Sequence, residues 1–131
     1  MMDKLSYCPF CNPESGREII LENDFACAMY DKFPVSNGHV LIIPKRHCSS
    51  YFELTIDEQT SCWEMVNELK EILTEKYHPD GFNIGINVND AAGQTIPHVH
   101  IHLIPRYKGD VREPEGGVRG VIPEKRVYRT K

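Results

Sequence analysis

The chain has 131 residues, of which 40% are apolar and 26% are charged, so we expect one globular domain with a real core rather than a disordered chain. Its formal net charge of −4 argues against a general nucleic-acid binder, because neutralising phosphates requires a basic face. No apolar run approaches the ~18 residues of a membrane span, which excludes an integral membrane protein.

The first segment of the chain carries a paired-cysteine motif and no apolar secretory signal. Cys8 and Cys11 are spaced as CxxC, which supplies two of the four ligands of a structural zinc site. A redox pair and a plain turn are the alternatives, although a redox motif usually lies at a helix N-terminus in a βαβ unit and none is evident. The five cysteines are an odd number, which favours a reducing cytoplasm over a disulfide framework.

Short strand patterns follow this motif. Apolar runs at 19–21 and 25–30 are separated by three polar residues and predict a hairpin. A loop with proline and glycine over 31–38 leads to a strand of buried type at 39–43, which Pro44 closes.

One helix is predicted from Thr55 to Tyr77, where a proline and a glycine follow. Thr55 and Glu58 form a possible capping box at its start. Apolar residues then recur at spacings of three and four, which gives the helix one buried face that supports the core. The residues on that face are Trp63, Val66, Leu69 or Lys70, Leu73 and Tyr77.

The most informative stretch follows a strand pattern over 82–88 and a glycine-bearing loop over 89–97. Residues 98–104 alternate strictly between histidine and apolar residues, which predicts a strand with its histidines on one face. Three of the six histidines of the chain therefore share one short face, and a purely structural role does not explain this. These residues are His98, His100 and His102.

Metal binding and nucleophilic catalysis are the two chemistries that such a face offers. At about 3.3 Å per residue, His98 and His102 lie roughly 13 Å apart, so they cannot both act in the same way on one reacting atom. The central His100 is the natural nucleophile. Gln94 and Thr95, in the preceding loop, are uncharged hydrogen-bond donors that suit phosphoryl oxygens, so the pattern suggests transfer at phosphorus.

Two segments resemble the histidine triad (HIT) family of nucleotide hydrolases and transferases. The first is Gly93-Gln94-Thr95 followed by His98-Val99-His100-Ile101-His102-Leu103, which is a very specific pattern. The second is Gly38-His39-Val40-Leu41-Ile42-Ile43-Pro44-Lys45, which is similar to the upstream strand of that family, with its fourth histidine. The resemblance covers about residues 7–106.

The resemblance implies an α+β fold, in which a HIT-like five-stranded antiparallel sheet packs on one long helix and continues across a homodimer. It makes residues 1–131 a single HIT domain, with a zinc-binding N-terminal segment at 1–14 and a C-terminal extension at 105–131. The implied partners are a nucleotide substrate and a second copy of the chain, with no nucleic acid and no membrane.

The resemblance also implies roles for individual residues. His100 would attack the α-phosphorus of a nucleotide and displace the leaving group, and water would then release the nucleoside monophosphate. His39, His102 and Gln94 would assist at the catalytic centre. The implied nucleotide-binding residues are Asp31, Asn87, Gln94, Thr95 and His102.

A zinc-bearing branch of the HIT family, and its galactose-1-phosphate uridylyltransferase relatives, resemble the cysteine motif together with two histidines. The resemblance implies a structural Zn²⁺ that pins the N-terminal segment against the sheet. Its ligands would be Cys8, Cys11, His47 and His98.

The residues in and after the triad favour one branch of the family. His102 is present where the transferases have glutamine, which favours hydrolysis, and Ile104-Pro105-Arg106 is closer to Fhit-like polyphosphate hydrolases than to Hint-like phosphoramidases. We therefore expect hydrolysis of dinucleoside polyphosphates, such as diadenosine tri- or tetraphosphate, with release of AMP. Arg106 and Arg119 are candidates for contacting a polyphosphate leaving group, or are solvated charges.

Three alternatives stay open at this point. The first is an adenosine phosphoramidase. The second is a nucleotide-binding signalling module with slow turnover. The third is a metal-binding protein that uses the triad histidines as ligands, although no carboxylate lies next to the triad to orient them.

Overall fold

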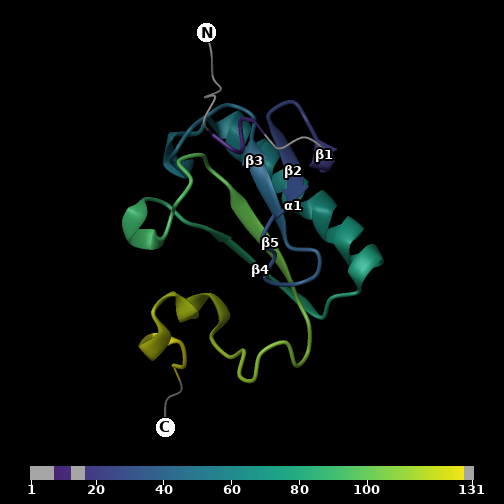
Figure 1. Cartoon of the computed structure of the whole chain (residues 1–131), viewed down its shortest axis with the longest axis vertical. Coiled ribbons are helices and arrows are strands. Elements are labelled where there is room, and N and C mark those ends of the chain that lie inside the picture. The colour runs from purple at the N-terminus through teal and green to yellow at the C-terminus, as the bar shows by residue number, and fades with distance from the viewer. Residues whose placement is uncertain (1–7, 13–16, 129–131) are drawn as a thin grey trace.

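The computed structural model describes residues 8–12 and 17–128. A five-stranded antiparallel sheet, with strand order β1-β2-β3-β5-β4, carries one long helix, α1, on one face (Figure 1). The elements are β1 (Ile19–Glu22), β2 (Ala26–Tyr30), β3 (Val40–Pro44), α1 (Ile56–Tyr77), β4 (Gly81–Ile86) and β5 (Ile101–Arg106). The expected α+β fold is confirmed, and the continuation of the sheet across a homodimer stays a prediction. In the described part of the chain, no helix is both long and apolar enough to cross a membrane.

The helix α1 begins at the predicted capping box. The Thr55 hydroxyl accepts a hydrogen bond from the Glu58 amide at 3.1 Å, and the Glu58 carboxylate accepts one from the Thr55 amide at 2.8 Å. The helix ends at His78, which takes the left-handed conformation with φ of 52° and donates its N–H to the Thr74 carbonyl. Both ends of α1 therefore lie where the sequence places them.

The buried face of α1 differs from the prediction at one position. Trp63 is 38% exposed, and its indole N–H donates to the Tyr51 hydroxyl at 3.0 Å. Cys62 and Met65 are fully buried instead, because the apolar seam runs one residue earlier than the large tryptophan suggests. The core between α1 and the sheet is made of Ala26, Ala28, Val40, Ile42, Cys62, Met65, Val66, Leu69, Leu73, Ile101 and Leu103.

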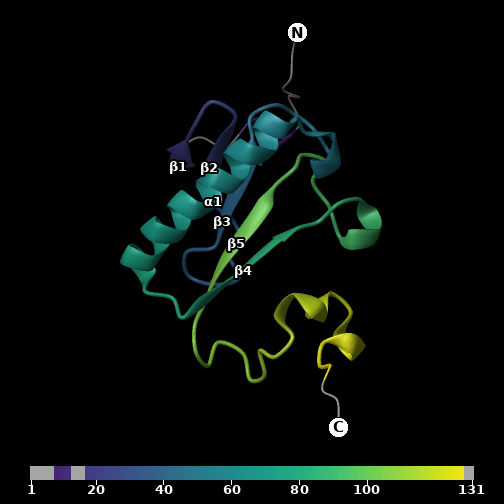
Figure 2. The ribbon, with the colours of Figure 1, turned by 180° about the vertical axis from the view of Figure 1, so that it is seen from behind.

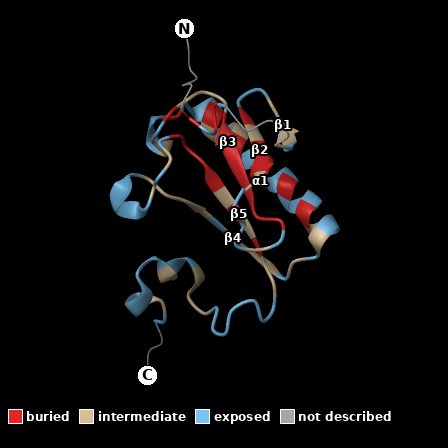
Figure 3. Cartoon of the chain, in the orientation of Figure 1, coloured by how far each residue is buried: buried red, intermediate tan, exposed pale blue. Residues whose placement is uncertain are grey.

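The face of the sheet opposite α1 is covered only at its two sides. On one side, residues 8–11 of the N-terminal segment pack on Met29, Leu41 and Ile43. On the other side, the C-terminal segment 107–128 lies beside β4, with short 3₁₀ helices η3 (Gly117–Val121) and η4 (Pro123–Lys125) (Figures 1 and 2). Figure 3 shows that burial concentrates in β2, β3, β5 and the inner side of α1, whereas the C-terminal segment is mostly exposed. The middle of this face is open.

The histidine strand enters the sheet later than predicted. The ladder between β3 and β5 begins with the pair of Ile42 and Ile101, so His98 and His100 precede the strand. Pro44 would stand opposite Val99 if the register continued, and proline has no N–H to donate. The Val99 amide instead donates to the carbonyl of Cys48 at 2.8 Å. Similarly, β4 ends at Ile86, two residues short of the predicted end at residue 88.

Of the predicted zinc-binding segment 1–14, residues 8–12 are described, and residues 1–7, 13 and 14 lie outside the described residues. The end of the predicted C-terminal extension, residues 129–131, lies outside them as well.

Candidate active site and metal centre

A hollow of about 480 Å³ lies on the open strip of the sheet and is here called the catalytic hollow. Six of the predicted catalytic and nucleotide-binding residues line it, although they come from segments far apart in the sequence: Asp31, His39, Asn87, Thr95, His100 and His102. Its other lining residues are Pro9, Phe10, Arg17, Lys32, Phe33, Val35, Leu41, Gly93 and Ile96.

The main chain fixes the tautomer of the neutral His100 ring. Its ring Nδ1 lies 2.8 Å from the carbonyl oxygen of His98, and because a carbonyl only accepts, Nδ1 carries the proton. In the neutral ring, Nε2 is therefore the nitrogen with the lone pair, which is the tautomer that a nucleophilic imidazole needs. The ring is buried, and Phe10 packs against it edge-on at 4.9 Å between ring centroids.

His39 and His102 form a hydrogen-bonded pair of defined direction. The Val35 amide donates to Nδ1 of His39 at 3.1 Å, so the His39 proton sits on Nε2. That nitrogen lies 3.0 Å from Nδ1 of His102 and 3.4 Å from a carboxylate oxygen of Asp31. When His39 donates to His102, the proton of His102 is left on Nε2. His102 can then act as a hydrogen-bond donor.

Both members of this pair stay neutral near pH 7. Burial, with smaller effects from the neighbouring His100 and His39, lowers the pKa of His102 to about 4 against the opposing charge of Asp31. Burial also lowers the pKa of His39, against the opposing effect of Asp31. Neutral rings can pass hydrogen bonds in sequence, which two imidazolium rings could not do.

Asp31, His39 and His102 also bring three possible metal-ligand atoms within 4.8 Å of one another. The proton on Nε2 of His39, fixed by the Val35 amide, occupies the position that a metal ion would need. The geometry therefore favours a hydrogen-bonded group over a metal site at these residues.

Asp31 combines the two roles weighed for it from the sequence. One carboxylate oxygen accepts from the Phe33 amide at 2.8 Å and so shapes the loop after β2. The same side chain lines the catalytic hollow beside His39, where it can accept hydrogen bonds from a ligand.

Gln94 builds the loop before the histidines rather than lining the catalytic hollow. Its side-chain oxygen accepts from the Asn89 amide at 2.9 Å. Its amide group donates to the carbonyl oxygens of Ser49, at 2.7 Å, and Ile96, at 3.1 Å. The contact of Gln94 with substrate stays a prediction.

Several lining residues were not identified from the sequence. Phe33 is 79% exposed and lines the catalytic hollow. Its place in the loop close after Asp31 is the feature of the sequence that could have predicted this role. Arg17 also lines the hollow, where its guanidinium donates to the Tyr30 carbonyl at 2.7 Å. The sequence before residue 19 shows no clear strand pattern, so the position of Arg17 was not predicted.

Neither Arg106 nor Arg119 lines the catalytic hollow. The Arg106 guanidinium binds Asp110 through two hydrogen bonds of 2.8 Å and Asn83 at 2.6 Å. This pairing raises the pKa of Arg106 and holds that of Asp110 well below its usual range. Arg119 donates to main-chain carbonyls of its own segment.

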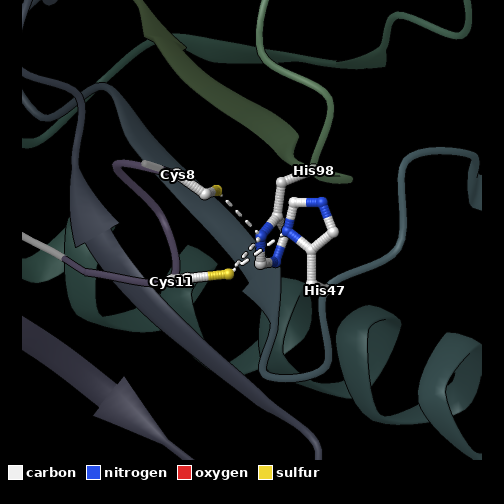
Figure 4. A group of neighbouring side chains, drawn as sticks. All are labelled: Cys8, Cys11, His47 and His98. Atoms are coloured by element: carbon white, nitrogen blue, oxygen red, sulfur yellow. Dashed lines mark hydrogen bonds between the residues drawn. The ribbon is translucent and has the colours of Figure 1, made fainter. Parts of the chain in front are cut away.

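The second group of site residues brings Cys8, Cys11, His47 and His98 together (Figure 4). Their ligand atoms all lie within 4.8 Å of one another. Nδ1 of His98 lies 3.4 Å from the Cys8 sulfur and 3.5 Å from that of Cys11, and Nδ1 of His47 lies 3.2 Å from the Cys11 sulfur. Zinc bonds of about 2.3 Å to sulfur and about 2.1 Å to nitrogen put tetrahedral ligands roughly 3.6 Å apart, so this group can hold such an ion.

The hydrogen bonding of His98 supports the same conclusion. Its Nε2 donates to the Pro44 carbonyl at 2.8 Å, which leaves the Nδ1 lone pair directed at the two sulfurs. Burial lowers the pKa of His98 to about 4, with smaller effects from His47 and His100, so the ring is neutral, as a metal ligand must be.

Residues 12–109 match the HIT domain family, a span that begins after the two cysteines. An uncharacterized HIT-like protein of Methanocaldococcus jannaschii is 36% identical over 79% of this chain and 80% of its own length. A bis(5′-nucleosyl)-tetraphosphatase (asymmetrical) of Schizosaccharomyces pombe is 35% identical over 75% of this chain, which spans 54% of that relative. The crystal structure of a zinc-bound histidine triad family protein of Mycobacterium smegmatis is 30% identical, with a TM-score of 0.72 over 82% of this chain and 84% of that one. The chain belongs to the HIT domain family.

Proposed function

We propose that this protein hydrolyses nucleoside 5′-phosphoryl bonds, with dinucleoside polyphosphates such as diadenosine tri- or tetraphosphate as substrates and AMP as a product. The observation that carries the proposal is the hydrogen bond from Nδ1 of His100 to the His98 carbonyl, at the edge of the catalytic hollow. The similarity to the bis(5′-nucleosyl)-tetraphosphatase of S. pombe supports this substrate class.

The reaction has two steps. Nε2 of His100 attacks the α-phosphorus and forms an N–P bond, while the bond from phosphorus to the bridging oxygen breaks. With diadenosine tetraphosphate as substrate, ATP is the leaving group, and AMP stays bonded to the ring. The His98 carbonyl accepts a hydrogen bond from Nδ1–H of His100 throughout, which stabilises the positive charge that develops on the imidazole. Water next attacks phosphorus, the N–P bond breaks, and AMP and one proton are released.

The other lining residues bind the substrate. Nε2–H of His102 donates a hydrogen bond to a phosphoryl or bridging oxygen. Asn87 and Thr95 add uncharged hydrogen-bond donors. Asp31 accepts hydrogen bonds from the ribose hydroxyls. The base lies against the apolar part of the catalytic hollow, formed by Phe33, Val35 and Leu41.

A structural Zn²⁺ is part of the proposal, with Cys8, Cys11, His47 and His98 as its ligands. When bound, the ion links the N-terminal segment to the loop after β3 and to the chain just before His100. It takes no part in the reaction. A homodimer and a cytoplasmic location remain predictions from the sequence and its resemblance.

Intact-protein mass spectrometry during turnover of diadenosine tetraphosphate tests the proposal. Wild type should gain a transient mass of one AMP and release AMP, and His100→Ala should do neither. His78→Asn is the matched control, because it removes a histidine outside the site and asparagine tolerates the left-handed conformation there. It should behave as wild type.

The same measurement with an adenosine phosphoramidate separates the two bond classes. An adduct with the phosphoramidate alone would replace dinucleoside polyphosphates by phosphoramidates as the substrate class. Absence of any adduct and of AMP with both compounds would contradict hydrolysis and favour a nucleotide-binding module.

A further inference from the structure

A second hollow of about 450 Å³ adjoins the catalytic hollow, and we call it the distal hollow. The two share four lining residues, so they are continuous across the pair of His39 and His102. The shared residues are Val35, His39, Asn87 and His102. A ligand whose phosphorus lies at His100 can therefore extend past His102 into the distal hollow.

The distal hollow lies between the sheet and the C-terminal segment. Its floor includes Gly85 of β4 and Ile104 of β5, on the face of the sheet opposite α1. Its outer wall is η3, which contributes Val118 and Val121, 59% and 76% exposed. Exposed valines in such a wall offer apolar contact surface to a ligand.

The charge of the distal hollow sets it apart from a phosphate site. Among the described residues that line it, none is an aspartate, glutamate, lysine or arginine. Two arginines of the segment that forms its outer wall, Arg119 and Arg126, are already engaged. Arg119 donates to the Lys125 carbonyl at 2.8 Å and stacks on Tyr128 at 4.7 Å, and Arg126 donates to the Glu113 carbonyl at 2.8 Å. The lining thus suits an uncharged group better than further phosphates or an ammonium group.

Contacts within the C-terminal segment and with β4 fix the position of the outer wall. Gly116 has φ of 91°, and a Cβ at this position would collide with the carbonyl oxygen of Arg126, so only glycine fits this turn. Arg126 also donates to the Glu115 carbonyl, which ties the start and the end of the segment together. Gly117 lies against Asn83 of β4. These contacts hold η3 at the mouth of the hollow.

We propose that the distal hollow is a subsite for the uncharged planar ring at the far end of the leaving group, the base of the second nucleoside. This inference rests on the proposed function and narrows its substrate class. It makes the C-terminal segment a specificity element that selects substrates with a nucleoside at each end. Mononucleoside polyphosphates, whose far end is a charged phosphate, and substrates with amine leaving groups gain no binding energy from the distal hollow.

The test compares two substrates that differ only at the leaving end, diadenosine tetraphosphate and adenosine 5′-tetraphosphate. The double variant Val118→Asn/Val121→Asn makes the wall polar without adding a charge that would repel phosphates. It should lower kcat/KM for diadenosine tetraphosphate on the order of tenfold, as losing about 50 Å² of apolar contact would give, and leave adenosine 5′-tetraphosphate unchanged. Val111→Asn is the matched control, an exposed valine of the same segment outside the distal hollow, and should change neither rate.

Equal effects of the double variant on both substrates, or no effect on either, would overturn the inference while hydrolysis at His100 still stands. Conversion of a dimer to a monomer by the double variant, with equal loss on both substrates, would show that a second copy covers the distal hollow instead. Failure of wild type to form an AMP adduct with either substrate would overturn the proposed function, and the inference with it.

Discussion

His98 donates its Nε2 proton to the carbonyl oxygen of Pro44 at 2.8 Å, and this contact turns the unprotonated Nδ1 toward the sulfurs of Cys8 and Cys11. The carbonyl of the same residue accepts the Nδ1 proton of His100. One residue thus joins the metal group by its side chain and the proposed nucleophile by its main chain.

Cys8→Ser should lose the bound zinc and unfold at a temperature lower by about 10 °C, because the ion contributes folding free energy directly. Zinc content by elemental analysis and thermal unfolding measure both effects. Cys48→Ser is the matched control, since Cys48 is also a buried cysteine and lies outside the metal group. Full zinc content in Cys8→Ser, or equal loss in Cys48→Ser, would contradict the assigned ligands.

His39→Asn should lower kcat for diadenosine tetraphosphate by about 100-fold and change KM by less than about threefold, because it removes the donor that fixes the proton of His102 on Nε2. His39→Gln, which can place an N–H near the position of Nε2, should recover part of kcat. Steady-state kinetics of both variants, with thermal unfolding to verify folding, give the answer. Equal rates for the two variants would mean that His39 acts by filling space alone.

Glu58→Gln should reduce the free energy of unfolding by about 2 kcal/mol, since Glu58 is 4% exposed and binds Arg46 through two hydrogen bonds of 2.8 Å. Arg46 lowers the pKa of Glu58, so this stabilisation is present at neutral pH and is lost as the pH falls through the lowered pKa. Urea unfolding at pH 7 measures the change. Glu71→Gln, at an exposed pair of 3.5 Å, should cost less than about 0.5 kcal/mol.

Acidification between pH 6.5 and about 4 should destabilise the protein, because in this range His102 binds a proton in the unfolded chain and stays neutral in the folded one. His102→Gln should reduce the slope of unfolding free energy against pH by up to about 1.4 kcal/mol per pH unit. Unfolding curves at several pH values, at matched zinc content, test this. His78→Gln should keep the wild-type slope, and an unchanged slope in His102→Gln would refute the assignment.

The elements that the sequence predicts well are those set by local signals. The capping box of Thr55 and Glu58 starts α1 at the expected residue, and short apolar runs or alternating apolar residues mark the strands of the confirmed sheet. The family resemblance predicts that His39 and His100 belong to one site. In the structure both line the catalytic hollow, because β3 pairs with β5 although the two strands are far apart in the sequence.

The features that the sequence does not predict depend on contacts between distant segments. The side-chain amide of Gln94 donates to the carbonyl of Ser49, 45 residues away in the sequence, and no pattern near Gln94 predicts this contact. The proton position on His39 depends on the Val35 amide, which the fold of one loop places. The outer wall of the distal hollow, which includes Val118, depends on arginine side chains that donate to main-chain carbonyls. Such contacts have no sequence signature, because every residue has a main-chain carbonyl.

Pro44 ends the pairing of β3 with β5 just before His100, the proposed nucleophile, so the segment around His100 lacks regular strand pairing. The Lys45 amide donates toward β2, so an N–H at position 44 would face β5 and could extend the ladder there. A variant such as Pro44→Ala would gain sheet pairing and draw residues 98–100 toward regular strand geometry, away from the hydrogen bond that holds Nδ1 of His100. Selection for heat resistance and selection for turnover should therefore act in opposite directions at this one residue.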